Sequence, residues 1–183
     1  MGNCSRRDFL KFGTGLLAGC LVPATAWSAL PPDGSRRTLS FYNTHTGERL
    51  SVCYYSKGAY CPDALKKINH ILRDHRTGEV QAIDRRLLDL IYTVNQRLAS
   101  GTPFHIISGY RSPKTNAQLR KRSSGVAKRS FHMLGRAIDI RLPGCNTGKL
   151  RKACLDLKIG GVGYYPKSDF VHVDTGAFRT WRG

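Results

Sequence analysis

The chain has 183 residues and a formal net charge of +18, because thirty lysines and arginines face only twelve aspartates and glutamates. The length fits one ordinary domain with a real hydrophobic core, and the absence of internal repeats or low-complexity tracts excludes a repeat protein. A surface this basic favours polyanionic partners in general.

The amino terminus has the form of an export signal. Residues 5–11 read S-R-R-D-F-L-K, which is typical of a twin-arginine signal, and the apolar stretch 12–22 is too short to span a bilayer. Cleavage after Ala26, at the end of a small-x-small site, would release the chain, and we favour it. The segment L-A-G-C ending at Cys20 also fits a lipobox, which would leave a lipid anchor there. Either outcome predicts a periplasmic protein with no nucleic-acid partner.

The next residues predict a linker at 27–37 and one domain at 38–183. Alternating residues at 38–42 and 50–55 predict a hairpin around a T-G-E turn. A first helix is expected to begin at Pro62, and a second helix to be capped by Asp84.

The second half of the domain predicts strands that alternate with helices. An apolar strand is expected at 104–108, and a polar helix at 113–123 that covers the rim of a site. Alternating strands at 136–142 and 170–174 flank a helix at about 149–157. These elements predict an α+β fold, a single domain with a small, mostly antiparallel sheet flanked by helices.

Four cysteines follow the signal, and their even number in an oxidising compartment predicts disulfides. Their spacing does not fit a zinc knuckle, and sequence cannot choose among the three possible pairings. The four residues are Cys53, Cys61, Cys145 and Cys154.

Two alternating strands carry the residues with the most specific chemistry. Asp139 shares one face of its strand with Arg141, and His172 shares one face of its strand with Asp174. If these polar faces meet, Asp139 and His172 reach one metal ion, and His132 can fold back over them before a bend at Gly135. Two histidines and one carboxylate form a three-ligand zinc set, whose open fourth position is typical of catalytic sites.

The motifs around these residues resemble a known family. The string S-x-H-x-x-G-x-A-x-D at 130–139 and the segment S-G-Y-R-S at 108–112 are similar to those of M15-type zinc peptidases. The pieces N-T-H-T-G-E at 43–48 and F-V-H-V-D-T-G at 170–176 resemble, more narrowly, the murein endopeptidase K group of that family. The resemblance covers about residues 38–181.

The resemblance implies a role for each residue of the site. His132, Asp139 and His172 would bind Zn²⁺, and Asp169 would carry a proton between the attacking water and the leaving amine. Arg111 would clamp a substrate carboxylate or steady the oxyanion, with Tyr110 beside it contacting substrate.

The same resemblance predicts hydrolysis of peptide cross-links in peptidoglycan, whose peptide stems would be the partner of a monomeric enzyme. Two other enzyme activities fit the same residues: a D,D-carboxypeptidase and an L-alanyl-D-glutamate peptidase. A wall-binding domain without turnover is the alternative from another class, and the complete ligand set argues against it. We expect Asp174 to orient a ligand rather than to take part in the reaction.

Overall fold

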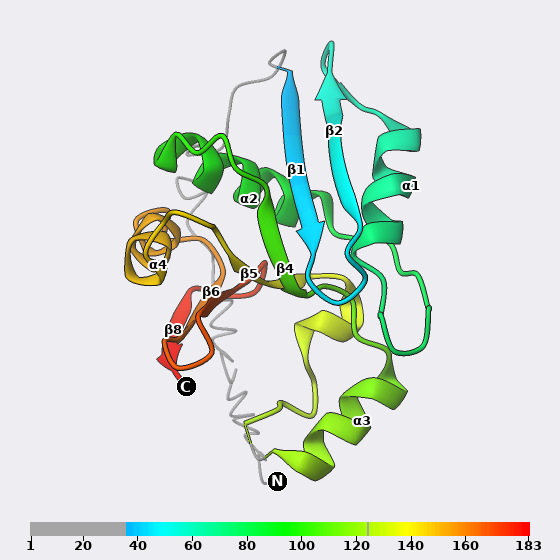
Figure 1. The fold of residues 1–183 in the computed structure, drawn as a ribbon, viewed down its shortest axis with the longest axis vertical. Coiled ribbons are helices and arrows are strands. Elements are labelled where there is room, and N and C mark those ends of the chain that lie inside the picture. Colours follow the sequence, from blue (N-terminus) through cyan, green and yellow to red (C-terminus); the bar gives the residue numbers. More distant parts are fainter. Residues whose placement is uncertain (1–35, 124) are drawn as a thin grey trace, which may run out of the picture.

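The computed structural model describes residues 36–123 and 125–183, and in these residues the chain forms a single domain with one eight-stranded sheet and four α-helices (Figure 1). The strands are β1 (Arg37–Asn43), β2 (Arg49–Ser56), β3 (Ala59–Tyr60), β4 (Phe104–Ser108), β5 (Ala137–Arg141), β6 (Gly161–Tyr165), β7 (Phe170–Asp174) and β8 (Arg179–Arg182). The helices are α1 (Pro62–Ile71), α2 (Arg85–Leu98), α3 (Pro113–Arg122), α4 (Thr147–Leu155) and the short 3₁₀ helix η2 (Phe131–Leu134).

The sheet has the order β3-β2-β1-β4-β5-β7-β6-β8. Five of its neighbouring pairs are antiparallel, and the pairs β1–β4 and β6–β8 are parallel. The predicted α+β class and the mostly antiparallel sheet are therefore confirmed. The sheet is extended at its far edge by β6 and β8, which the sequence analysis did not predict as strands.

Side chains cap the beginnings of α2 and α3, and the cap of α2 is the predicted Asp84. The Asp84 carboxylate accepts a hydrogen bond from the backbone N–H of Arg86, which satisfies one free donor at the start of α2. The Ser112 hydroxyl does the same for Thr115 in α3, where Pro113 occupies the first turn. Proline fits there because the first helical N–H groups have no partner within the helix.

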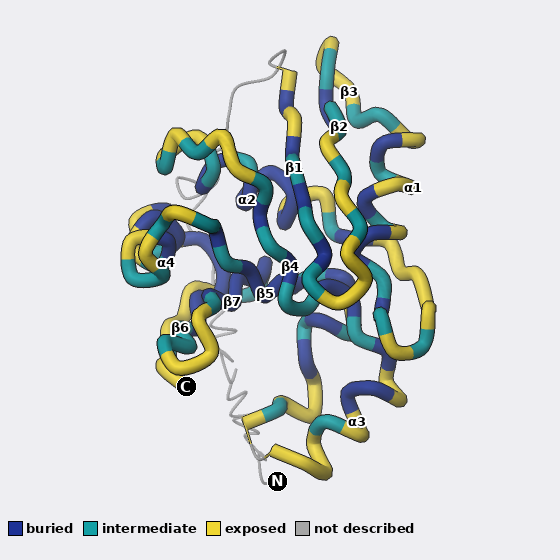
Figure 2. Tube along the Cα trace, in the orientation of Figure 1, coloured by how far each residue is buried: buried dark blue, intermediate teal, exposed yellow. Residues whose placement is uncertain are grey.

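The hydrophobic core lies between the sheet and its covering helices, with α1 against β2, α2 against β1 and α4, and α4 against β6 and β7. Ile138 and Ile140 of β5 and Val171 and Val173 of β7 are at most 1% exposed and belong to this core. Because side chains alternate along a strand, the polar residues of β5 and β7 point to the opposite face of the sheet. Figure 2 shows this central part of the chain as its most buried region.

The four cysteines of the described domain are free thiols, so the expected disulfides are absent from this part of the chain. The Cys53 thiol donates to the backbone oxygen of Tyr55 within β2, and the Cys61 thiol lies 3.9 Å from the Ser56 hydroxyl. Cys154 is buried in α4, and burial together with the nearby Cys145 raises the pKa of its thiol to about 12.

The predicted signal at 1–26, its lipobox cysteine Cys20 and nearly all of the linker at 27–37 lie outside the described residues. Among the helices that are described, none is long and apolar enough to cross a membrane.

Candidate metal centre

The two strands predicted to carry metal ligands are neighbours in the sheet. β5 and β7 pair antiparallel, and their register places Asp139 directly opposite His172. This pairing confirms the prediction that the polar faces of the two strands meet.

A tight bend brings the third residue of the set over these strands. His132 lies in η2, whose start is capped by the Ser130 hydroxyl, which accepts from the His132 backbone N–H at 3.3 Å. Gly135 ends the turn with φ +63°, and a Cβ at this position would lie 2.3 Å from the backbone oxygen of Ala82. Glycine is required here because other residues disfavour positive φ and because the backbone approaches closely.

Three ligand atoms from these residues converge. His172 Nδ1 lies 2.8 Å from Asp139 Oδ1, and His132 Nε2 lies 3.2 Å from His172 Nδ1 and 3.3 Å from Asp139 Oδ1. All three residues are buried. They form a group of metal-ligating side chains whose donor atoms lie within 4.8 Å of one another.

The outer nitrogen of each imidazole fixes the orientation of its ring. His132 Nδ1 donates to the Gly109 backbone oxygen at 2.7 Å, and His172 Nε2 donates to Asp174 Oδ2 at 3.0 Å. With these outer N–H groups in place, His132 Nε2 and His172 Nδ1 are the nitrogens that can bind a metal beside Asp139; until a metal replaces its proton, His172 Nδ1 donates to Asp139 Oδ1 at 2.8 Å. Two imidazole nitrogens and one carboxylate oxygen suit zinc, and both rings have the hydrogen-bonded support found behind zinc-binding histidines.

The protonation equilibria follow from the same contacts. Burial alone would raise the pKa of Asp139, but the two histidines outweigh it and hold that pKa well below its usual range. Burial opposes the charged form of His172, but hydrogen bonds to Asp139 and Asp174 raise its pKa to about 9 in the protein without metal. Burial lowers the pKa of His132. Asp139 therefore stays an anion, as a metal-binding carboxylate must.

Asp174 is held from behind by β8 and by backbone donors. Its carboxylate is fully buried and accepts from Arg179 at 3.1 Å and 2.5 Å, and also from the N–H groups of Gly161 and Gly176. Burial alone would raise the pKa of Asp174, but hydrogen bonds from His172, Arg179 and Gly176 outweigh it and hold that pKa below its usual range. Arg179 thus holds the Asp174 carboxylate in place, and this carboxylate in turn sets the orientation of the His172 ring.

Arg111 reaches the centre from the loop after β4, as the segment S-G-Y-R-S predicted. Its guanidinium lies 3.7 Å from Asp139 Oδ2 and donates to the Ser108 hydroxyl at 3.3 Å and to Asn116 Oδ1 at 3.5 Å. Burial lowers its pKa, and its Nε is buried without a hydrogen-bond partner among the described residues. A positive charge with unused donors therefore stands beside the metal-ligating group.

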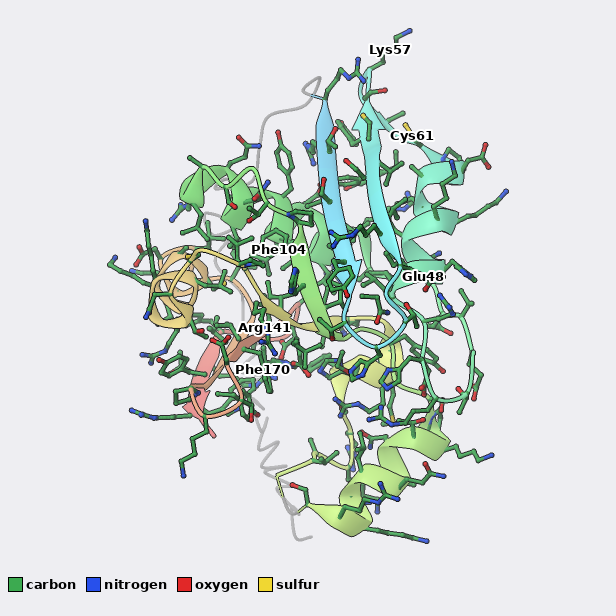
Figure 3. The ribbon with its side chains drawn as sticks, in the orientation of Figure 1. Glu48, Lys57, Cys61, Phe104, Arg141 and Phe170 are labelled. Carbon is green, nitrogen blue, oxygen red and sulfur yellow. The ribbon has the colours of Figure 1, made fainter. Side chains whose placement is uncertain are left out.

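The structure does not bring Tyr110 and Asp169 to the centre. Tyr110 is 9% exposed and packs in the hydrophobic core. Asp169 lies in the turn between β6 and β7, as expected, with φ +51°, but its carboxylate accepts from the Thr147 hydroxyl and lies 3.5 Å from Arg141 Nη1. Neither residue lines the cavity over the metal-ligating group. Arg141 and Phe170, at the ends of the strands beside this turn, are labelled in Figure 3.

A cavity of about 590 Å³ opens over the metal-ligating group. Arg111, His132, Asp139 and His172 contribute to its lining, and aromatic side chains form one wall. In that wall the Trp181 indole N–H donates to the Tyr165 hydroxyl at 2.9 Å, and Tyr165 stacks on Phe170. Gly163 makes room for the wall, because a Cβ there would lie 2.6 Å from the Trp181 ring.

Sequence reasoning missed the contribution of β8 to this site. Arg179 and Trp181 both line the cavity, yet the segment R-T-W-R is short, polar and at the end of the chain, so its pattern gave no signal. The glycine-rich segment of β6 likewise lacks the alternation that marks a half-buried strand.

A buried His–Asp–His group that could hold a metal ion lies under an open cavity, on an α+β sheet with an arginine beside it, and this arrangement fits the class of metal-dependent hydrolases. The family model described as peptidoglycan L,D-endopeptidase MepK, a group of M15 peptidases, matches residues 32–181. The chain belongs to this family, whose M15 members are metallopeptidases.

Named relatives agree with the family model over nearly the whole chain. The peptidoglycan L,D-endopeptidase MepK of Escherichia coli strain K12 is 40% identical over 179 residues, which cover 98% of each chain. The probable peptidoglycan L,D-endopeptidase MepK of Haemophilus influenzae is 39% identical over 180 residues, which cover 98% of this chain and 96% of the relative.

Proposed function

We propose that this protein is a zinc-dependent endopeptidase that hydrolyses peptide cross-links in peptidoglycan. The convergence of His132, Asp139 and His172 at the floor of an open cavity is the observation that carries the proposal. The names of its relatives supply the substrate class, since they are peptidoglycan endopeptidases.

The protein groups divide the chemistry between them. His132 Nε2, Asp139 and His172 Nδ1 would hold the zinc, which when bound would polarise an amide carbonyl and make water a nucleophile near neutral pH. The Gly109 carbonyl and Asp174 keep the two rings in the tautomers that this binding needs. The contacts of Asp139 with the two histidines keep its carboxylate ionised despite its burial, because they hold its pKa well below the usual range.

Arg111 is proposed to bind the substrate at the edge of the metal centre. A guanidinium can form two parallel hydrogen bonds with a carboxylate or stabilise negative charge that develops on the carbonyl oxygen. The long contacts of 3.3 to 3.7 Å to Ser108, Asn116 and Asp139 leave it free to make shorter ones to a ligand. Tyr110 supports the same loop from the core, where its backbone N–H donates to Leu72.

Asp169 is proposed as the proton carrier, under a condition that the structure defines. Its carboxylate must exchange the Thr147 hydroxyl and Arg141 for the scissile amide. The next residue after Asp169 is Phe170, which lines the cavity. The exchange therefore requires a movement of Asp169 and its turn only.

The names of the relatives favour one type of cross-link. An L,D-endopeptidase cuts between an L and a D centre, as in a link from diaminopimelate to diaminopimelate, rather than between two D centres. We infer that the protein reaches this substrate in the periplasm through its twin-arginine signal, either in released form or anchored at Cys20, and that it acts as a monomer.

Mass spectrometry of a peptidoglycan digest tests the proposal. Purified protein should convert muropeptides with diaminopimelate cross-links to monomers, and a chelator should stop the conversion until zinc is restored. Loss of only a terminal D-alanine would indicate a D,D-carboxypeptidase, and stems cut after L-alanine would indicate an L-alanyl-D-glutamate peptidase. Binding to peptidoglycan without any new product would indicate a wall-binding domain.

A further inference from the structure

A strongly basic arm borders the cavity. We define the arm as the described residues 113–123 and 125–129, which comprise α3 and most of the segment that leads from it to η2. Its sequence contains six lysines and arginines and no acidic residue. Figure 1 shows α3 standing apart from the sheet, and Figure 2 shows most of its surface exposed. The six exposed cations are Lys114, Arg120, Lys121, Arg122, Lys128 and Arg129.

These six charges have no partner among the described residues of the protein. Other surface cations do have partners, such as Lys66 with Asp63 and Lys152 with Asp156. A cluster of like charges repels itself, and that repulsion is relieved when an anion binds.

The arm is joined to the metal centre by hydrogen bonds at its base. The Asn116 side chain donates to the Ala127 backbone oxygen at 3.2 Å and accepts from Arg111. The Ser112 backbone N–H donates to the buried Asp74 carboxylate at 2.8 Å. The base of the arm therefore has a defined position beside Arg111, and the exposed cations extend from that base.

The arm also forms one wall of the cavity. Five of its residues line the cavity: Ser123, Gly125, Val126, Ala127 and Arg129. A substrate peptide that occupies the cavity lies along these residues of the arm. The part of that peptide beyond the cavity then comes within reach of the exposed cations of the arm.

We propose that the arm binds the free carboxylates of peptide stems that neighbour the cross-link being cut. This inference rests on the proposed function and adds to it that the preferred substrate is the polycarboxylate polymer rather than one cross-linked peptide pair. A single exposed ion pair contributes little, but several cations facing a repeating anion contribute together. A soluble cross-linked peptide pair would occupy the cavity but would leave most cations of the arm without a carboxylate to bind.

The test compares two variants that lose the same charge. The arm variant is Arg120→Gln/Lys121→Gln/Arg122→Gln, and the control variant is Lys57→Asn/Lys67→Gln/Arg97→Gln. All six replaced residues are exposed and unpaired in the described part of the chain. Lys57 lies at the end of the molecule remote from α3 (Figure 3). Thermal unfolding of both variants should match the parent protein, because surface substitutions change stability little.

Two readouts are needed, one with turnover and one without. On intact peptidoglycan at about 0.05 M salt we expect the arm variant to lose about fivefold in kcat/KM, and about as much in co-sedimentation with the insoluble polymer. The control variant should lose less than about twofold, and both should cut a soluble cross-linked peptide pair at the parent rate. At about 0.3 M salt the difference should shrink, because exposed charges are screened.

Three outcomes would overturn the inference. Equal losses in the two variants would indicate an effect of net charge alone, and no loss in the arm variant would indicate a solvated surface. If the arm variant loses binding to phosphatidylglycerol vesicles but keeps binding to peptidoglycan, the partner is a lipid surface. The proposed function fails separately, when the parent protein cuts neither substrate, and co-sedimentation still decides the role of the arm in that case.

Discussion

Asp174 shows how a single side chain can control the metal centre without facing the cavity. It is fully buried, accepts from His172 Nε2, and is itself held by Arg179 and two backbone N–H groups. This arrangement fixes which nitrogen of His172 points at the other ligands. The role expected from the sequence, orientation of a ligand, fits these contacts.

Asp174→Asn should therefore weaken metal binding more than it slows the reaction. We expect the zinc dissociation constant to rise about 10- to 100-fold, while turnover at saturating zinc stays within about threefold of the parent protein. Competition with a chromogenic chelator measures the first quantity and peptide cleavage the second. Unchanged zinc affinity with lost turnover would mean that Asp174 takes part in the reaction itself.

Arg111→Lys should fail nearly as badly as Arg111→Ala, because an ammonium cannot reproduce the planar two-bond fork of a guanidinium. We expect at least about tenfold loss of kcat/KM on cross-linked muropeptides for both variants. The loss should lie in KM if the contact is equally strong in ground and transition states, and in kcat if it acts on the oxyanion. Arg97→Ala, on the exposed face of α2, is the control. Near-parental rates for both Arg111 variants would mean that Arg111 does not contact the substrate.

Two variants distinguish a role of Asp169 in proton transfer from a purely structural role in its turn. Asp169→Asn should retain zinc and lose about 100-fold or more in turnover if the carboxylate carries the proton. Thr147→Val removes the hydroxyl that now binds this carboxylate, so it should leave turnover unchanged or raise it. Similar small losses in both variants would mean that Asp169 only fastens the turn between β6 and β7.

At the scale of the elements, the alternation of polar and apolar residues was sufficient to predict β5 and β7. Ile138 and Val173 face the core while Asp139 and His172 face the site, and this pattern also fixed their pairing. The cap at Asp84 likewise predicted the start of α2. Strand alternation and helix caps depend on residues that are close together in the sequence, so they can be predicted from one sequence.

Features that depend on long-range contacts were not predictable in the same way. β8 exists because it pairs with β6, and its segment alone shows no strand pattern. Asp169 has φ +51° and its carboxylate accepts from the Thr147 hydroxyl, and spacing along the chain shows neither feature. Tyr110 sits within a site motif, yet its ring packs in the core.

The loop before α3 depends on one buried carboxylate. Asp74 is 1% exposed and accepts from the backbone N–H groups of Ser112 and Arg76. Burial alone would raise the pKa of Asp74, but these hydrogen bonds help to lower it to about 2. Its folded-state pKa lies below the unfolded value of about 3.9, so its contribution to stability is present above about pH 4 and is lost as the pH falls towards 2.

Asp74→Asn should lower the free energy of unfolding at neutral pH by about 2 kcal/mol, the usual cost of a weakened buried hydrogen bond to a charged group. Between about pH 4 and pH 2 the difference between the variant and the parent protein should narrow, since the parent carboxylate becomes protonated. Urea unfolding at several pH values measures both effects. A stability difference that is constant across this range would show that the charge of Asp74 does not support the loop.

At the scale of the whole molecule, the metal centre joins parts of the chain that lie far apart in sequence. His132 comes from η2, Asp139 from β5 and His172 from β7, and Arg179 supports them from the last strand. A ligand that binds only the folded state stabilises it according to its concentration and affinity. Zinc should therefore raise the melting temperature as well as permit cleavage.

The zinc content of purified protein tests the central claim most directly. Elemental analysis should find about one zinc per chain in the parent protein and less than about a tenth of that in the double variant His132→Ala/His172→Ala, which should also fail to cut peptidoglycan. Circular dichroism establishes that the variant is folded. A folded double variant that keeps its full zinc, or a parent protein that cuts cross-links without any bound metal, would contradict the account.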